Sequence, residues 1–191
     1  DGSGLIKSPE GGGAWNFISK TTASSDSTID ITSGLDSTYK TYVFTFNNMH
    51  PGTDFKWLQF NLSIDGGSNY NVTKTSSFFG ASQYESDANA ELIYEAAWDL
   101  AQDTGVQRLT ENIGADNDQS SSGYLWIFDP SNTTYVKHYL LRMSTVHASD
   151  LSKVSYGAGY GNTTSAIDAI QFSMASGNID SGDICLYGIS T

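Results

Sequence analysis

The stretch Leu58–Thr73, LQFNLSIDGGSNYNVT, carries apolar side chains that alternate on a two-residue period around a turn at residues 65–67. A second stretch, Ala169–Ile189, AIQFSMASGNIDSGDICLYGI, has the same alternation around Gly177 and Gly182. Alternation on both sides of a glycine-containing turn is typical of two antiparallel strands with one buried face. Each stretch is therefore predicted to form an antiparallel pair, the first with its return strand over residues 70–75, and the chain is predicted to be predominantly β.

Alternating or strongly apolar runs occur along most of the remaining chain, over residues 15–19, 27–31, 41–49, 56–64, 106–113, 124–128, 135–146 and 153–161. Residues 87–100 are less clear, because their Ala, Glu and Leu suit either a short helix or a strand near residues 94–100. About ten strands with frequent turn signals predict an all-β fold. We expect an antiparallel double-sheet β-sandwich of jelly-roll type with at most one short helix.

The 191 residues are enough for one sandwich with a proper hydrophobic core. Residues 1–13 contain five glycines and a proline, a composition that predicts a glycine-rich tether or linker. The chain is therefore divided into a tether over residues 1–13 and a single β-sandwich domain over residues 14–191.

The formal net charge is −12, and the nine Lys and Arg residues are scattered singly. Nucleic acid is excluded as a partner, because no basic stripe is present to neutralise a phosphate backbone. No apolar run approaches the roughly 20 residues that span a bilayer, so membrane insertion is not expected.

Cys185 is the only cysteine, so an internal disulfide is impossible. It alternates with Ile184 and Leu186, and no neighbour in the sequence would lower the pKa of its thiol. A half-buried structural thiol is the interpretation we favour.

No enzyme signature is present. A Gly-x-Ser-x-Gly elbow is missing, and His50, His138 and His147 stand in positions that suit structural roles. A glycosidase would need two carboxylates at a defined separation. Nothing in the sequence marks two of the available glutamates as such a pair; these are Glu85, Glu91, Glu95 and Glu111. No catalytic residue is assigned.

Metal and cofactor sites are not expected either. Residues 116–120, DNDQS, resemble the opening of a calcium loop, but Ser121 stands where that loop needs glycine and Ile127 where it needs a bidentate carboxylate. Asp180 and Asp183 are interpreted as turn-capping residues. The glycines of residues 156–161 lack the strand-to-helix context of a phosphate loop.

A sugar-stacking surface would need exposed rings. Aromatic residues make up 13% of the chain, and five of them could form such a surface: Tyr84, Tyr94, Trp98, Tyr156 and Tyr160. Because most aromatic residues of a sandwich fill its core, we expect each of these in the core. The ligand-binding residues stay unassigned.

Four segments carry a family resemblance: residues 63–72, 133–138, 158–167 and 176–188. They look like those of structural appendage proteins of tailed bacteriophages of aquatic bacteria, a similarity that covers about residues 15–189. The resemblance implies a β-sandwich displayed on the virion as a tail-fibre, baseplate or capsid-knob domain, usually as a trimer. It carries no active-site residues.

The sequence therefore leads to the hypothesis of a non-enzymatic virion structural protein in a fibre, baseplate appendage or host-contacting spike on the particle surface. Its expected partners are other virion proteins, further copies of itself in a trimer and a host surface glycan. Trp57 and Tyr139 are the residues predicted to lie at the contact between copies. The alternatives are a capsid decoration protein, a carbohydrate-binding or lectin-like module, and a filament-forming extracellular protein.

Overall fold

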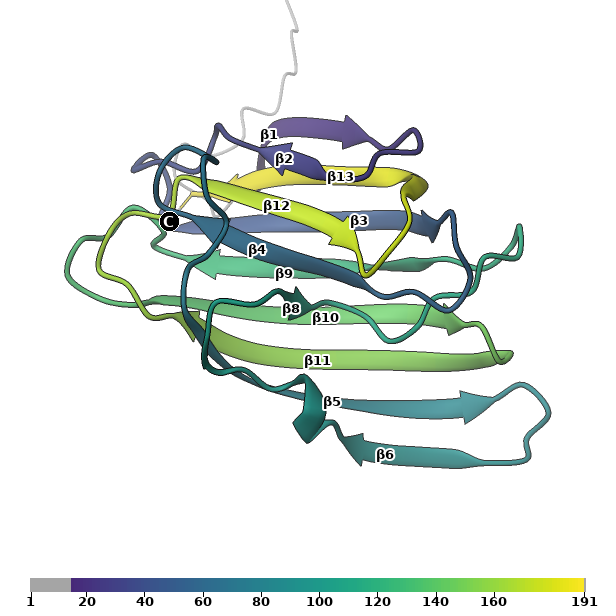
Figure 1. The fold of residues 1–191 in the computed structure, drawn as a ribbon. Helices are drawn as coiled ribbons and strands as arrows, with labels where there is room; N and C mark the ends of the chain where they lie inside the picture. The colour runs from purple at the N-terminus through teal and green to yellow at the C-terminus, as the bar shows by residue number, and fades with distance from the viewer. Residues whose placement is uncertain (1–14, 191) are drawn as a thin grey trace, which may run out of the picture.

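The computed structural model describes residues 15–190, and these fold into two antiparallel β-sheets packed face to face (Figure 1). The tether predicted for residues 1–13 lies outside the described residues. The expected antiparallel double-sheet sandwich is confirmed. Among the described residues the only helix is a single 3₁₀ turn, η1 (Ala96–Trp98).

The larger sheet has nine strands in the order β1-β13-β3-β9-β10-β11-β5-β6, with β7 also paired to β5. Their bounds are β1 (Trp15–Thr22), β3 (Thr41–Pro51), β5 (Lys74–Tyr84), β6 (Ala90–Tyr94), β7 (Ala101–Asp103), β9 (Ser121–Phe128), β10 (Lys137–His147), β11 (Leu151–Gly161) and β13 (Ile179–Ile189). The smaller sheet has the order β2-β12-β4-β8, formed by β2 (Ile29–Ile31), β12 (Ala169–Met174), β4 (Leu58–Ser63) and β8 (Gln107–Arg108).

The two sheets are built from one long folded ribbon. β3 pairs with β13 in the large sheet, β4 with β12 in the small sheet, and β5 with β11 in the large sheet again. The two halves of the ribbon thus pass together from one sheet to the other and back, which is the winding of a jelly roll.

The two predicted antiparallel pairs are wrong as pairs. β4 lies in the small sheet and the next strand, β5, in the large one; the predicted return strand over residues 70–75 does not form. β12 and β13 are separated in the same way. The turn itself exists, with Gly66 at φ 70° and Gly67 at φ 87°, but it leads the chain across the sandwich instead of back along the same sheet.

Two other expectations are corrected. Residues 87–100 form neither a regular helix nor a strand over 94–100: β6 ends at Tyr94 and η1 follows it. Of the strand predicted over residues 106–113, only Gln107–Arg108 forms a strand, β8; Ile113 makes isolated bridges to Lys56 and His147, and the residues between are largely buried.

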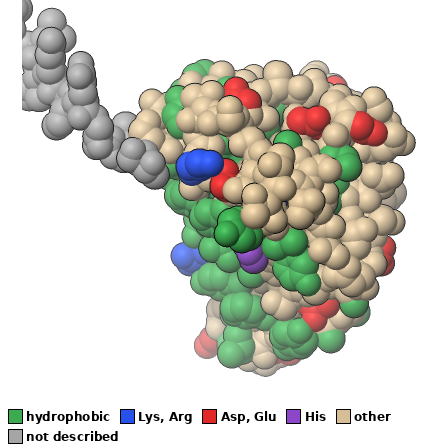
Figure 2. Space-filling view, turned by 90° about the vertical axis from the view of Figure 1, so that its left-hand side faces the viewer, with side chains coloured by type: hydrophobic (Ala, Val, Ile, Leu, Met, Phe, Trp, Pro, Cys, Tyr) green, Lys and Arg blue, Asp and Glu red, His purple; other side chains and the backbone are tan. Residues whose placement is uncertain are grey.

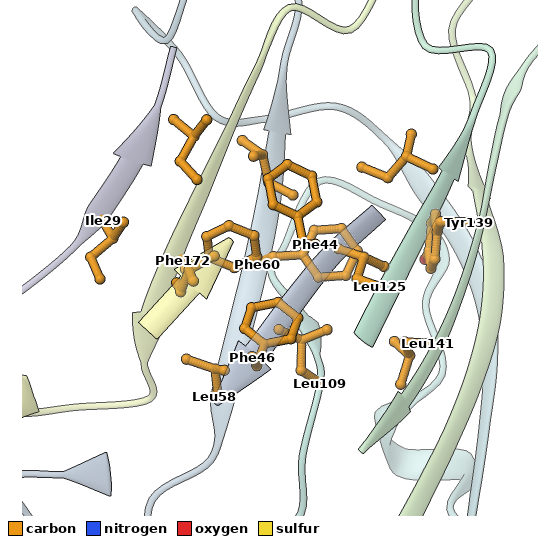
Figure 3. Close-up of a cluster of buried hydrophobic side chains, with 14 of the residues drawn as sticks. Ile29, Phe44, Phe46, Leu58, Phe60, Leu109, Leu125, Tyr139, Leu141 and Phe172 are labelled. Carbon is orange, nitrogen blue, oxygen red and sulfur yellow. The ribbon is translucent and has the colours of Figure 1, made fainter. Parts of the chain in front are cut away.

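The core lies between the sheets and is rich in aromatic rings (Figure 3). The ring of Phe172 in the small sheet lies 5.4 Å from that of Phe44 and 5.3 Å from that of Phe46, both edge-on, while Phe60 meets Tyr139 at 5.3 Å. These five side chains are at most 1% exposed. Burial of such rings is worth about 2–3 kcal/mol each, so the aromatic contacts between the sheets provide much of the driving force for packing.

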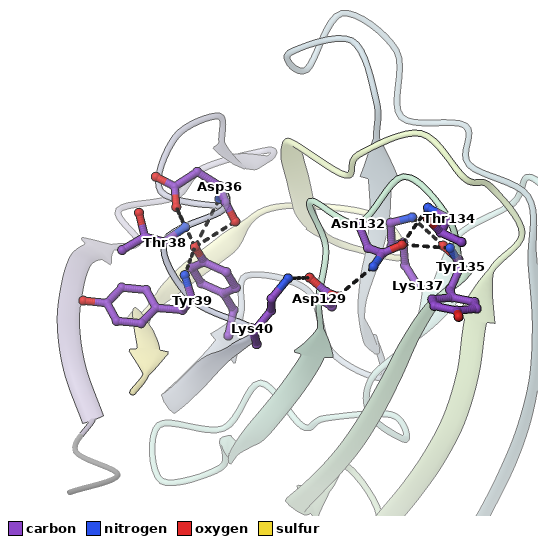
Figure 4. Close-up of polar contacts among 10 residues, drawn as sticks. Asp36, Thr38, Tyr39, Lys40, Asp129, Asn132, Thr134, Tyr135 and Lys137 are labelled. Carbon is purple, nitrogen blue, oxygen red and sulfur yellow. Dashed lines mark hydrogen bonds and ion pairs between the residues drawn. The ribbon is translucent and has the colours of Figure 1, made fainter. Parts of the chain in front are cut away.

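Side-chain hydrogen bonds stabilise the loops at one end of the sandwich (Figure 4). The Asp129 carboxylate accepts hydrogen bonds from Lys40 Nζ at 3.0 Å and from Asn132 Nδ2 at 2.9 Å. The side-chain oxygen of Asn132, Oδ1, accepts hydrogen bonds from the backbone N–H groups of Thr134 and Tyr135. The Lys40 and Asn132 contacts hold the pKa of the Asp129 carboxyl below its ordinary value, despite some desolvation. The loop between β9 and β10 is therefore ordered by its own side chains.

Candidate interaction surface

The face of the large sheet that points away from the small sheet is the most distinctive surface of the molecule, and we call it the outer face. We define it by three rows of residues that follow one another across the sheet, largely by strand pairing. The first row is Phe17, Tyr187, Val43, Trp126, Leu140, Ala158 and Ser77. The second is Lys20, Cys185, Thr45, Tyr124, Arg142, Tyr156, Phe79 and Tyr94. The third is Trp15, Ile189, Thr41, Phe128, His138, Tyr160 and Thr75.

Large apolar side chains are concentrated on this face. Six of the eleven exposed large hydrophobic residues of the described chain belong to the three rows: Trp15, Phe17, Phe79, Tyr94, Tyr124 and Leu140. Their exposed fractions run from 36% for Tyr124 to 62% for Tyr94. Figure 2, a view along the strands from one end of the sandwich, shows hydrophobic side chains gathered in a band down the left-hand side and lower part of the molecule. Contiguous apolar surface of this kind marks an interaction site.

Ring contacts hold the aromatic side chains of the outer face in place. Trp15 from β1 reaches Trp126 from β9 edge-on at 5.7 Å, and it also meets Tyr187 at 5.4 Å. Phe79 and Tyr156 stack at 5.1 Å with an interplanar angle of 11°. Val43 is fully buried although it belongs to the outer face. The rings therefore form an ordered layer of their own and not a set of separate side chains.

Two shallow hollows adjoin on this face. One of about 520 Å³ is lined by Phe79, Tyr124, Trp126, Arg142 and Tyr156, and one of about 510 Å³ by Thr75, His138 and Tyr160. Both share Ser77, Phe128, Leu140 and Ala158. Because they share these four residues, the two hollows make one trough across β9, β10, β11 and β5.

Charge is distributed unevenly. The chain has 21 Asp and Glu residues, yet the three rows contain none, while they do contain Lys20, Arg142 and His138. The guanidinium carbon of Arg142 lies 5.2 Å from the centre of the Tyr156 ring. At the edge of the face Lys20 Nζ pairs with Asp183 at 2.7 Å; this contact lowers the pKa of Asp183 and raises that of Lys20. The three rows of this acidic protein thus contain no carboxylate, although Asp183 pairs with Lys20 in the next row and Asp99 accepts the hydroxyl of Tyr94.

The two residues predicted to lie at a contact between copies do not belong to this face. Tyr139 is 1% exposed and points into the core, where its hydroxyl donates to Gln107 Oε1 at 2.9 Å, so that prediction is wrong. Burial raises the pKa of its phenol. Trp57 is partly buried and covered by Arg108, whose guanidinium carbon lies 3.3 Å from the ring centre.

The five aromatic residues considered for a sugar-stacking surface are expected in the core, but none of them is fully buried. Tyr94, Tyr156 and Tyr160 belong to the outer face, and Tyr94 is 62% exposed. Tyr84 is half-buried at the end of β5, and Trp98 packs on the edge of the core against Phe78. The sequence alone does not single out Trp126, Phe79 or Tyr124, because alternation shows that a strand has two faces but not which one the second sheet covers.

The other chemical candidates are dispersed. His138 lies on the outer face, His147 is buried beside Phe55, and His50 Nε2 lies 3.3 Å from the carbonyl of Asp116. Within residues 15–190 there is no group of three or more His, Cys, Asp or Glu side chains that could hold a metal ion. Cys185 is 8% exposed, more deeply buried than the half-buried thiol we expected.

Glu111 is the buried member of the four glutamates considered above. Its carboxylate is 3.1 Å from Lys153 Nζ in a buried ion pair. Burial raises the pKa of Glu111, Lys153 opposes that rise, and the charge of Glu95 adds to it. In the part of the chain that the structure describes, no helix is both long and apolar enough to cross a membrane.

Comparison with known proteins gives no relative: the chain matches no family model, no curated protein and no solved structure. The fold is an all-β sandwich, and the outer face is the feature on which a function can be argued.

Proposed function

We propose that this chain is a non-enzymatic structural protein of a bacteriophage particle, displayed as part of a fibre, baseplate appendage or host-contacting spike, and that the outer face packs against further copies of the chain. The segments similar to phage appendage proteins support the first part. The aromatic, carboxylate-free outer face is the single observation that supports the second.

Electrostatics favours a second copy of the chain as the occupant of this face. With a net charge of −12, two copies repel each other through most orientations. Contact through the outer face avoids this cost, because the three rows bring together aromatic rings and no carboxylates. The exposed aromatic residues would then serve as the anchors of the interface. The resemblance to phage appendage proteins implies that these copies form a trimer.

The test is the molar mass of the purified protein by light scattering over a range of concentrations, with one pair of matched variants. Leu140→Glu puts a charge at the centre of the outer face, where Leu140 is 48% exposed. Ile64→Glu puts the same charge on an aliphatic residue of similar exposure, 42%, outside the face. We expect oligomers for the parent and Ile64→Glu, and monomers for Leu140→Glu. A parent protein that stays monomeric at every concentration would contradict self-association.

The location on a particle needs a separate measurement. Electron microscopy of virions labelled with an antibody against this domain is expected to show label on the tail or its appendages. Label spread over the capsid would instead support the alternative of a decoration protein.

A carbohydrate-binding module is the second candidate, and the trough supports it. Exposed rings such as Phe79 and Tyr156 provide faces on which sugar rings could stack, and Arg142 provides donors beside them. A glycan array tests this. Binding that Tyr156→Ala abolishes, by a protein that is monomeric, would favour this function over self-assembly.

A further inference from the structure

Lys74 and Asn61 form an unusual buried contact between the two sheets. Lys74 is the first residue of β5 in the large sheet and Asn61 lies in β4 of the small sheet. Lys74 is 0% exposed and Asn61 is 5% exposed, and Lys74 Nζ lies 2.5 Å from Asn61 Oδ1. An amine and a carboxamide, which can condense to a secondary amide, are thus held together away from water.

The surroundings of the carboxamide fix its orientation. Asn61 Oδ1 also accepts the backbone N–H of Leu62 at 2.9 Å, while Nδ2 donates to the carbonyl of Thr104 at 3.0 Å. The backbone N–H of Leu62 draws electron density from the amide carbon, as one donor of an oxyanion hole does. The nitrogen that would be released in a condensation, Nδ2, is held by its hydrogen bond to the Thr104 carbonyl.

The amine is placed to act as a nucleophile. Besides Asn61, Nζ donates to the carbonyl of Val72 at 2.7 Å, and two acceptors match the two N–H groups of a neutral amine, leaving its lone pair free. Burial lowers the pKa of Lys74 to about 8, with the charge of Asp103 opposing the shift. The amine is mostly protonated at pH 7, and a neutral fraction on the order of a tenth is available to react.

We propose that Lys74 and Asn61 condense to an isopeptide bond that links the small sheet to the large one. The lone pair of Nζ attacks Asn61 Cγ, the Nζ–Cγ bond forms, and the Cγ–Nδ2 bond breaks. A proton from Nζ passes to Nδ2, which leaves as ammonia, so no oxidant or other reactant is consumed. Asp103, whose Cα pairs with that of Lys74 across β5 and β7 and whose charge acts on the Lys74 amine, is the carboxylate assigned to the relay of that proton.

The product would be a cross-link in a chain whose single cysteine excludes a disulfide. It would close the crossover from β4 to β5, the same segment whose turn carries the chain from one sheet to the other. The bond would restrict separation of the sheets at this point, by the same chain constraint that a disulfide imposes.

Mass spectrometry of the denatured full chain tests the proposal. A cross-linked chain is lighter than the sequence mass by one ammonia. In addition, trypsin cannot cleave after a modified Lys74, so residues 57–108 are expected as one peptide that lacks one ammonia. An unmodified chain gives residues 57–74 and 75–108 separately, and that result would overturn the proposal.

Two controls make the measurement specific. Loss of ammonia through a succinimide at an asparagine leaves Lys74 cleavable, so a lighter chain with normal cleavage also contradicts the cross-link. Lys137 is equally buried at 1% exposure, but Nζ contacts the backbone carbonyls of Tyr135 and Thr163, not a carboxamide, and cleavage after it should be normal. Lys74→Arg is expected to keep the full mass. Asp103→Asn is expected to slow the loss of ammonia in freshly made protein, whereas an unchanged rate would remove Asp103 from the relay.

Discussion

Arg108 lies over the ring of Trp57: its guanidinium carbon is 3.3 Å from the centre of that ring and 4.2 Å from the centre of the Trp98 ring. Burial lowers the pKa of Arg108 to about 10, so it stays charged at neutral pH. We expect Arg108→Ala to lower the free energy of unfolding by about 2–3 kcal/mol, through lost cation–π attraction and lost packing. Urea denaturation followed by circular dichroism measures this. Arg142→Ala, at an exposed ring contact, should cost about 0.5 kcal/mol; equal losses would contradict the expectation.

Substitutions at Glu111 and Lys153, which form a buried ion pair, should have strongly non-additive effects on the free energy of unfolding. Lys153→Met leaves the Glu111 carboxylate buried without its partner and is expected to cost about 3 kcal/mol. Glu111→Gln combined with Lys153→Met removes both charges and should cost clearly less than the two single changes added together. A double-mutant cycle by urea denaturation checks this, and strict additivity would mean that the pair contributes nothing.

His147 predicts a loss of stability on mild acidification. The ring is 7% exposed, and Nδ1 accepts the backbone N–H of Ser149 at 3.1 Å, which requires an unprotonated Nδ1. Burial lowers the pKa of His147 below 6.5, so the unfolded chain binds a proton more readily. Its stabilisation is fully present above pH 6.5 and is lost as the pH falls through the folded-state pKa.

The variant His147→Asn keeps an acceptor near Nδ1 and cannot titrate. Between pH 7.5 and 5.5 the parent should lose more stability than this variant in urea denaturation. Glu111, whose raised pKa acts in the opposite direction, is present in both proteins and cancels in the difference. Identical pH dependence in the two would show that His147 is not responsible.

Tyr139 is expected to matter for folding and not for association. Tyr139→Phe removes the hydroxyl that donates to the buried Gln107 and should lower the free energy of unfolding by about 1–1.5 kcal/mol. Because the side chain is buried in one copy of the chain, light scattering should give an unchanged molar mass. A change in molar mass without a change in stability would restore the earlier expectation that Tyr139 lies at an interface.

The sequence predicts individual strands of this protein well but not their partners. In β10 the alternation of Tyr139 and Leu141 with Leu140 and Arg142 reproduces the buried and exposed positions directly. The turn at Gly66 and Gly67 is also real. Alternation is a local property, however, and it says nothing about which strand lies alongside, so it predicts hairpins where the chain makes two crossovers between the sheets.

The outer face was harder to predict for a related reason. Both faces of β9 and β10 carry large apolar residues, since Leu125 and Tyr139 face the core while Trp126 and Leu140 face outward. Hydrophobicity alone therefore predicts Tyr156 and Tyr94 in the core and Tyr139 at an interface. Only the position of the four-stranded sheet decides which side is covered.

The folded ribbon also constrains how the chain can be made. β13 lies between β1 and β3, so the edge strand β1 has no place in the large sheet until residues 179–189 have been synthesised and have left the ribosome. Until β13 has emerged, folding during translation is limited to partial assemblies with unpaired strand edges. The last long strand of the chain is therefore the one that completes the large sheet, and chaperone demand during production should be greatest before it pairs.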